Sequence, residues 1–182
     1  RDGFIWLATF NGLAQFDGVQ FRTYTAAGTP ELRNNFVNVL CEDSRGRLWI
    51  GNDTGEIAWR DRDGFQAVRL PPDWPLSPVE ALAEGRDGVI WVLSQAGGVA
   101  SIREGGVCQP LRESGRPRGY RFLVADQQRE IWLLRRDDTV AHLQAEGEIT
   151  DAGCPSPNSK VRMLFGGNRE GLWVLADDRL RR

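Results

Sequence analysis

Five tryptophans recur at a nearly fixed interval along this chain of 182 residues. They are Trp6, Trp49, Trp91, Trp132 and Trp173, and the gaps between them are 43, 42, 41 and 41 residues. A sequence period of about 40–45 residues is typical of architectures that stack similar units side by side. The spacing therefore predicts a repeat fold, and we expect these tryptophans to be structural core positions of the repeat.

Other positions keep the same register as the tryptophans. A leucine precedes the last four of them by nine residues, at Leu40, Leu82, Leu123 and Leu164, and each unit reads as four short strands separated by turns such as Asp63-Gly64. Four antiparallel strands per unit describe one blade of a β-propeller. We therefore predict an all-β fold, a single partial β-propeller of about 4.3 blades over residues 1–182, with approximate units 1–35, 36–77, 78–118, 119–159 and 160–182. The first and last units are incomplete, so we expect the chain to be a piece of a larger propeller.

The turn after the first strand of each unit carries its own signals. Asp43 and Asp126 both lie six residues before a tryptophan, and we expect their carboxylates to accept hydrogen bonds from the turn backbone. Later units depart from the glycine pattern, because Arg129 and Asp138 stand where earlier units have glycine. We expect these loops to adopt other conformations than those of the earlier units.

Composition excludes several classes of function. The net charge is −2 with no long block of one sign, which argues against a nucleic-acid partner. Cys41, Cys108 and Cys154 are widely spaced and form no C-x-x-C pair, so we predict neither a zinc site nor redox chemistry and expect them to be unpaired. The chain has no apolar run near 18 residues, so any membrane span would belong to missing downstream segments.

Catalytic signals are sparse. His142 is the only histidine and lies between Ala141 and Leu143 in an expected third strand, and no serine motif or phosphate-binding loop accompanies it. Two acidic pairs, 137–138 and 177–178, follow tryptophan-bearing strands but lack further oxygen ligands at the spacing that calcium requires. We therefore predict no catalytic residue, no metal site and no cofactor.

A ligand surface is predicted at one face of the propeller, in the loops between second and third strands and in the connections between blades. Amide, guanidinium and aromatic side chains in these loops suit a polar ligand such as an oligosaccharide. Trp74 lies outside the tryptophan period and is the candidate for ring stacking. The alternative for each residue is a solvated loop position. The candidates are Asn35, Asn52, Trp74, Gln95, Arg135 and Arg136.

Two segments resemble a known repeat. Residues 43–55 read D-S-R-G-R-L-W-I-G-N-D-T-G, and residues 2–18 read D-G-F-I-W-L-A-T-F-N-G-L-A-Q-F-D-G. Both resemble the two-component regulator propeller repeat, whose blade runs D-x-x-G-x-[LI]-W-[IL]-G-T-x-x-G-[LI]. The match is fullest in the first two units and weakens toward the end of the chain.

The resemblance implies a sensor. It implies a non-catalytic propeller in the periplasmic or extracellular portion of an inner-membrane protein, where ligand binding would act through a homodimer on an output domain such as a histidine kinase or a diguanylate cyclase. Two alternatives stay open. One is a structural or protein-interaction module without a small ligand. The other, more remote, is a propeller lyase, against which the single histidine counts.

Overall fold

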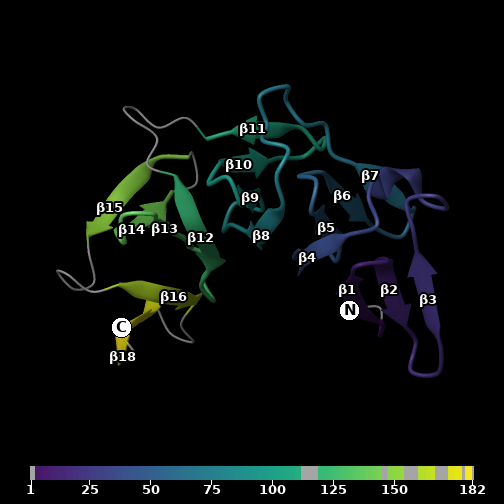
Figure 1. Ribbon diagram of the computed structural model, residues 1–182, viewed down its shortest axis with the longest axis horizontal. Coiled ribbons are helices and arrows are strands. Elements are labelled where there is room, and N and C mark those ends of the chain that lie inside the picture. Colours follow the sequence, from purple (N-terminus) through teal and green to yellow (C-terminus); the bar gives the residue numbers. More distant parts are fainter. Residues whose placement is uncertain are drawn as a thin grey trace.

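The computed structural model describes residues 3–111, 119–144, 147–153, 160–166, 172–177 and 179–181. Within these residues the chain forms five antiparallel sheets in sequence order (Figure 1). The three middle sheets have four strands each, and the first and last have three. The prediction of an all-β fold made of propeller blades is therefore confirmed.

Each sheet consists of consecutive strands, and we number the sheets as blades 1 to 5. Blade 1 contains β1 (Ile5–Thr9), β2 (Gly12–Phe16) and β3 (Phe21–Tyr24), and a 3-10 helix, η1 (Pro30–Leu32), follows it. Blade 2 contains β4 (Val37–Glu42), β5 (Leu48–Asn52), β6 (Ile57–Arg60) and β7 (Phe65–Ala67). Blade 3 contains β8 (Val79–Glu84), β9 (Ile90–Ser94), β10 (Val99–Ile102) and β11 (Cys108–Pro110). Blade 4 contains β12 (Tyr120–Ala125), β13 (Ile131–Arg135), β14 (Val140–Leu143) and β15 (Ile149–Gly153), and blade 5 contains β16 (Val161–Gly166), β17 (Leu172–Ala176) and β18 (Arg179–Arg181).

The blades follow one another around an open arc, with the two chain ends at its two extremities (Figure 1). The first strands of the complete blades line the inside of the arc, where β8 contacts both β4 and β12. Because these strands run side by side around the axis, residues about 42 positions apart in the sequence become neighbours.

The core lies between the blades. Trp49 of blade 2 is 1% exposed and packs in one cluster with Ile90 and Val92 of blade 3. Trp91 is 3% exposed and occupies the corresponding place against blade 4. Each of the four clusters contains the periodic tryptophan of one blade and side chains from the second strand of the next blade. Burial of these tryptophans therefore holds neighbouring blades together.

A buried aspartate closes the turn after the first strand. In blade 2, Asp43 Oδ1 accepts hydrogen bonds from the backbone N–H groups of Arg45 at 3.0 Å and Arg47 at 2.9 Å. Its Oδ2 accepts from Trp49 Nε1 at 2.9 Å, which ties the turn to the core tryptophan. In blade 4, Asp126 accepts two backbone N–H bonds in the same way. The predicted role of both aspartates is confirmed.

The prediction for the two glycine replacements is wrong. Arg129 has φ 61° and Asp138 has φ 66°, in the same left-handed region as Gly46 at 78° and Gly55 at 89°. The loops keep the conformation of the glycine-bearing units because the surrounding hydrogen bonds impose it. A non-glycine residue costs about 1–2 kcal/mol there, and an aspartate tolerates the region better than most.

One glycine is required by the close approach of two blades. A Cβ atom added to Gly51 would lie 2.6 Å from Val79 Cγ1 of the next blade and 2.8 Å from Val39 Cγ1. We expect Gly51→Ala to lower the free energy of unfolding by about 1–3 kcal/mol, because the added methyl overpacks the interface. Urea denaturation measures this loss. Gly28→Ala is the control, because no atom lies within 4 Å of its added Cβ, and an equal loss in both variants would contradict the steric explanation.

Candidate functional site

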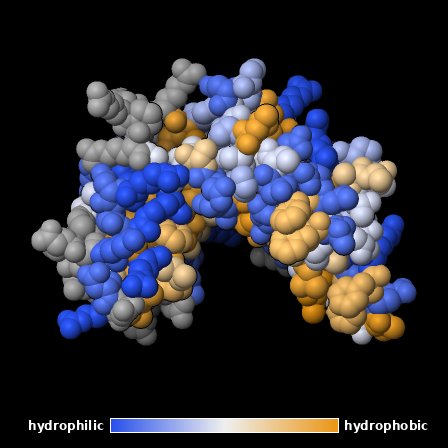
Figure 2. All heavy atoms as spheres, viewed as in Figure 1, coloured by the Kyte–Doolittle hydropathy of each residue, from blue (hydrophilic) through white to orange (hydrophobic). Residues whose placement is uncertain are grey.

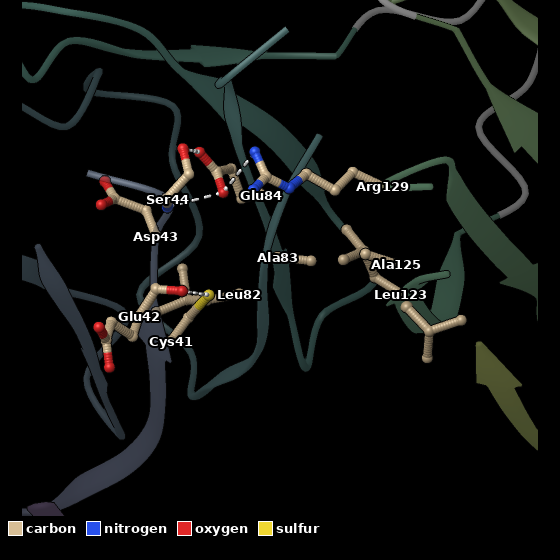
Figure 3. Close-up of a pocket in the computed structure, with 11 residues that line it drawn as sticks. Cys41, Glu42, Asp43, Ser44, Leu82, Ala83, Glu84, Leu123, Ala125 and Arg129 are labelled. Carbon is tan, nitrogen blue, oxygen red and sulfur yellow. Dashed lines mark hydrogen bonds and ion pairs between the residues drawn. The ribbon is translucent and has the colours of Figure 1, made fainter. Parts of the chain in front are cut away.

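A cavity of about 650 Å³ opens on the inside of the arc, where β4, β8 and β12 end. Its lower wall is apolar and its rim, at the turns that follow these strands, is polar (Figure 3). Three blades contribute, so the cavity exists only because the first strands are arranged around the axis. The lining residues are Cys41, Glu42, Asp43, Ser44, Leu82, Ala83, Glu84, Leu123, Val124, Ala125 and Arg129.

A polar link across three blades forms the rim. Ser44 of blade 2 donates to Glu84 of blade 3 twice, from its backbone N–H at 2.9 Å and from its hydroxyl at 2.6 Å. The Nη1 atom of Arg129 in blade 4 lies 3.2 Å from Oε2 of the same carboxylate (Figure 3). The Glu84 side chain is 9% exposed and that of Arg129 is 42% exposed. The carboxylate is therefore fixed, while part of the guanidinium remains accessible from the cavity.

The thiol in the cavity is not set up as a nucleophile. Burial, together with the smaller effect of the nearby Glu84 and Asp43 carboxylates, raises the pKa of Cys41 to about 11. The thiol therefore stays protonated at neutral pH, and a protonated thiol is a poor nucleophile. Cys41 and Cys108 are both unpaired, as predicted, and Cys154 lies outside the described residues.

The rim offers both kinds of hydrogen-bonding group. Arg129 can donate, Glu84 can accept, and the Ser44 hydroxyl can do either, whereas the Glu42 carboxylate points away from the cavity (Figure 3). A ligand rich in hydroxyl groups, each of which donates and accepts, matches such a rim better than a purely anionic or cationic ligand. The part of the chain that the structure describes contains no group of three or more potential metal ligands, and Asp178 of the second acidic pair lies outside it.

Three of the six predicted ligand residues are exposed. Asn35 accepts a hydrogen bond from the Ala26 backbone N–H at 2.7 Å. Arg136 reaches across to the preceding blade, where its Nη2 donates to the Gln95 carbonyl at 2.9 Å. Asn35, Gln95 and Arg136 are all exposed to solvent at this end of the blades.

The other three are buried in the structure. Trp74 is 5% exposed, belongs to the core cluster between blades 2 and 3, and donates from Nε1 to the Gly55 carbonyl at 2.8 Å. Asn52 is 2% exposed and accepts from the backbone N–H of Glu56 at 2.9 Å. Arg135 is 6% exposed and donates to Asp151 at 2.6 Å. Because they are buried, none of these three side chains can stack on or bind a ligand without moving.

The predicted residues and the cavity lie at opposite ends of the blades. Val37, at the start of β4, pairs with Asn52, whereas Glu42, at its end, pairs with Leu48. The predicted residues are at the Asn52 end and the cavity is at the Glu42 end, so none of the six lines it. The sequence signal that could have indicated the cavity is the glutamate that ends the first strand in two successive blades, at Glu42 and Glu84.

The single histidine lies away from this cavity. His142, on β14 as predicted, places Nε2 2.9 Å from Glu130 Oε2, and its ring centroid is 4.7 Å from that of Trp132. It lines a separate cavity of about 280 Å³ between blades 3 and 4. The imidazole therefore contacts a carboxylate and an aromatic ring, and it does not line the cavity on the inside of the arc, which we call the axial cavity.

The described residues form no helix that is long and apolar enough to span a membrane.

Comparison with known proteins confirms the resemblance of one repeat. Residues 31–54, which include Trp49, match the family model described as two component regulator propeller. A search among curated proteins finds no match for the chain.

Solved structures share the fold. A catalytically inactive virginiamycin B lyase from Staphylococcus aureus aligns with a TM-score of 0.75 and 19% identity over 95% of this chain and 59% of the lyase chain. Two structures of the extracellular domain of BT4673 from B. thetaiotaomicron, described as a hybrid two component system and as a one component system, align with TM-scores of 0.67 and 0.72 at 17% and 15% identity. They cover 94% and 99% of this chain, which in turn spans 27% and 26% of those domains. The chain thus spans about three fifths or less of these structures, and at such identities the likeness shows the fold alone.

Proposed function

We propose that this chain is part of the non-catalytic, extracytoplasmic sensor propeller of a membrane signalling protein, and that it binds a polar ligand such as an oligosaccharide. The observation that carries the proposal is the match of residues 31–54 to the two component regulator propeller model. The similarity of the fold to extracellular domains described as two component and one component systems supports it. The protein would lie in the periplasm or outside the cell and transmit binding through a homodimer to a histidine kinase or diguanylate cyclase.

We further propose that the ligand occupies the axial cavity. Arg129 and Ser44 would donate hydrogen bonds to ligand oxygens, and Glu84 would accept from ligand hydroxyls. The half-buried side chains of Cys41 and Ala125 would contact the hydrophobic face of the ligand. Because the three blades that line the cavity contribute different groups, binding would change the contacts between blades, which is a route for a signal to leave the site.

Thermal unfolding with a panel of neutral and acidic oligosaccharides tests this proposal. A binder at one hundred times its dissociation constant stabilises the folded state by about 2.7 kcal/mol, which corresponds to a rise in Tm of roughly 5–10 °C for a chain of this size. We expect Arg129→Asn to abolish the rise, since asparagine tolerates the left-handed backbone but lacks the guanidinium. Arg45→Gln is the matched control, because Arg45 lies in the equivalent turn of blade 2 but pairs with Glu104 outside the cavity. No shift with any sugar would argue for a propeller that serves only in structure or protein interaction.

A lyase is the second candidate, suggested by the structural likeness to virginiamycin B lyase. An eliminating enzyme needs an acid or base within hydrogen-bond reach of its substrate. His142, the one histidine of the chain, contacts Glu130 and does not line the axial cavity. We therefore favour the sensor, and an assay of streptogramin B cleavage by the purified chain distinguishes the two.

A further inference from the structure

Blade 3 lacks the buried aspartate that closes the turn in blades 2 and 4. The residue six positions before the periodic tryptophan is Asp43 in blade 2 and Asp126 in blade 4, but Gly85 in blade 3. The backbone of the turn is nevertheless the same. The Gly85 N–H donates to the Val89 carbonyl at 2.8 Å, and the two aspartates make the equivalent bond at 3.0 Å each. Blade 3 therefore keeps the turn without its carboxylate.

Two N–H groups lose their acceptor with this carboxylate. Trp49 and Trp132 donate from Nε1 to their aspartates at 2.9 and 3.2 Å. The Trp91 side chain is buried as well, at 3% exposed, but its indole N–H has no hydrogen-bond partner among the described residues. The same holds for the backbone N–H of Asp87, whose equivalents in blades 2 and 4 donate to the aspartate. Buried polar groups are normally paired, so the Trp91 N–H marks a place where an acceptor is missing.

The missing acceptor leaves space that belongs to a cavity. A Cβ atom added to Gly85 would lie 3.2 Å from Trp91 Nε1 and 3.1 Å from Asp87 Oδ1. Gly85, Asp87 and Trp91 all line the cavity of about 280 Å³ between blades 3 and 4. Sites for small molecules begin at roughly 300 Å³, and one water molecule takes about 30 Å³ of liquid volume. The cavity is therefore far larger than a single water and comparable to a small ligand site.

Charged groups on the cavity walls already pair with one another. Arg86 Nη2 lies 2.6 Å from Glu130 Oε1, and Glu130 Oε2 lies 2.9 Å from His142 Nε2. The Asp87 carboxylate is partly offset by Arg103, whose Nη1 lies 4.0 Å from its Oδ2. These pairs leave the described walls with donors and acceptors but without a strong charge of one sign, which favours a neutral polar ligand over an ion.

The position of Asp87 separates a hydroxyl from a carboxylate as the missing group. Its Oδ1 accepts from the Val89 backbone N–H at 3.2 Å and lies beside the point toward which Trp91 donates. A ligand carboxylate at that point would meet a like charge, which disfavours it. A hydroxyl can accept from the Trp91 N–H and donate to Asp87 Oδ1 at the same time.

We propose that the cavity between blades 3 and 4 binds a neutral, hydroxyl-rich ligand of monosaccharide size, with one hydroxyl in the place of the missing aspartate. That hydroxyl accepts from Trp91 and donates to Asp87, and further hydroxyls contact Glu130 and Arg129 on the walls. The axial cavity opens on the hollow inner side of the arc (Figure 2), whereas this cavity lies between two blades. Arg129 lines both, but Gly85 and Trp91 line only the second, so this site is independent of a ligand in the axial cavity.

Two-dimensional ¹H–¹⁵N NMR of the chain tests this assignment, because each tryptophan indole N–H gives its own signal. We expect glucose, galactose or mannose, titrated over about 1–100 mM, to shift the Trp91 signal to saturation. Gly85→Asp supplies the missing carboxylate within the chain, so it should move the Trp91 signal without sugar, which identifies that signal, and abolish the shift with sugar. Gly28→Asp is the matched control, because it adds the same charge at a position where no atom lies within 4 Å of the added Cβ, and it should retain the shift.

Sodium acetate, compared with sodium chloride at the same concentration, distinguishes a hydroxyl site from a carboxylate site. Acetate should leave the Trp91 signal in place because of the Asp87 charge. A saturable shift with acetate but not with sugars, no saturable shift of the Trp91 signal with any of the three sugars, or a sugar shift that survives Gly85→Asp would each overturn the proposal. Stabilisation by an oligosaccharide in the axial cavity would persist in Gly85→Asp, so failure of one site can be told from failure of the other.

Discussion

Asp43→Asn is expected to lower the free energy of unfolding by about 3–5 kcal/mol, as is typical when one partner of a buried charge pair is removed. The Asp43 side chain is 0% exposed, and its Oδ2 accepts hydrogen bonds from Arg47 Nε at 2.6 Å and from Trp49 Nε1 at 2.9 Å. The substituted amide would either turn its N–H₂ group toward these two donors or leave two backbone N–H groups without an acceptor. In both orientations, the Arg47 guanidinium loses its carboxylate. Urea denaturation at pH 7 measures the loss.

Asp126→Asn is the matched control, because Asp126 holds the equivalent turn of blade 4. It accepts from Trp132 Nε1 at 3.2 Å, but Glu130 stands at the position that Arg47 has in blade 2. Without a cation to leave unpaired, the loss should be about 1–3 kcal/mol, the usual penalty for an unsatisfied buried group. Equal losses in the two variants would show that the Asp43–Arg47 ion pair adds no stability beyond that of the hydrogen bonds within the turn.

The effect of Asp43→Asn should also depend on pH. Burial alone would raise the pKa of Asp43, but hydrogen bonds from Trp49 and Arg47 and the charge of Arg47 outweigh it, so the pKa lies below its ordinary value of 3.8. A carboxyl whose pKa is lowered in the folded state stabilises that state above the unfolded value, and the stabilisation is lost as the pH falls through the folded pKa. The difference between wild type and Asp43→Asn should therefore be constant from pH 7 down to about pH 5 and shrink below about pH 4. A difference that grows with acid would contradict this account.

Much of the fold could be predicted because its determinants are local and repeated. The tryptophan recurs once per blade, and its neighbours along the strand alternate between two faces, so spacing alone indicates blades. The aspartate six residues before Trp49 acts within a single turn, and its role follows from residues 43–49. Interactions between residues of the same repeat recur from one repeat to the next, and they therefore leave a periodic signal in the sequence.

The axial site could not be predicted in the same way. Ser44, Glu84 and Arg129 stand five, seven and three residues before their tryptophans, so they share no position in the repeat. They meet because three blades are arranged around one axis, and their link joins residues about 40 positions apart. Such a site depends on how blades are placed relative to each other, which a single repeat does not encode.

Trp74 shows that the local sequence can also suggest exposure for a side chain that is buried. A tryptophan outside the period in a proline-rich connection is a reasonable candidate for an exposed stacking residue. In the structure the ring belongs to the same core cluster as Trp49 and Ile90, and its N–H donates to the Gly55 carbonyl. Burial of a large aromatic ring is favourable wherever the backbone brings it to a core, so composition of a loop is a weak guide to exposure.

The second large effect is expected from Trp91→Ala, in the interface between blades 3 and 4. The Trp91 side chain is 3% exposed and packs against Ile131 and Leu133. We expect a loss of about 3–5 kcal/mol in the free energy of unfolding, because truncation removes buried apolar area and leaves a cavity. The strands on both sides are held in register by their own sheets, so they cannot move together to fill the space.

The loss should also change how the chain unfolds. In repeat proteins each unit is stabilised mainly by its contacts with its neighbours, so weakening one interface can separate the units on either side of it. Urea unfolding followed by circular dichroism should broaden, or split into two transitions, because blades 1 to 3 no longer depend on blades 4 and 5. Trp6→Ala is the control, because Trp6 is only half-buried and lies in the terminal blade, and it should cost about 1–2 kcal/mol without broadening the transition. A sharp single transition for Trp91→Ala with a loss no larger than that of Trp6→Ala would mean that the tryptophans do not carry the coupling between blades.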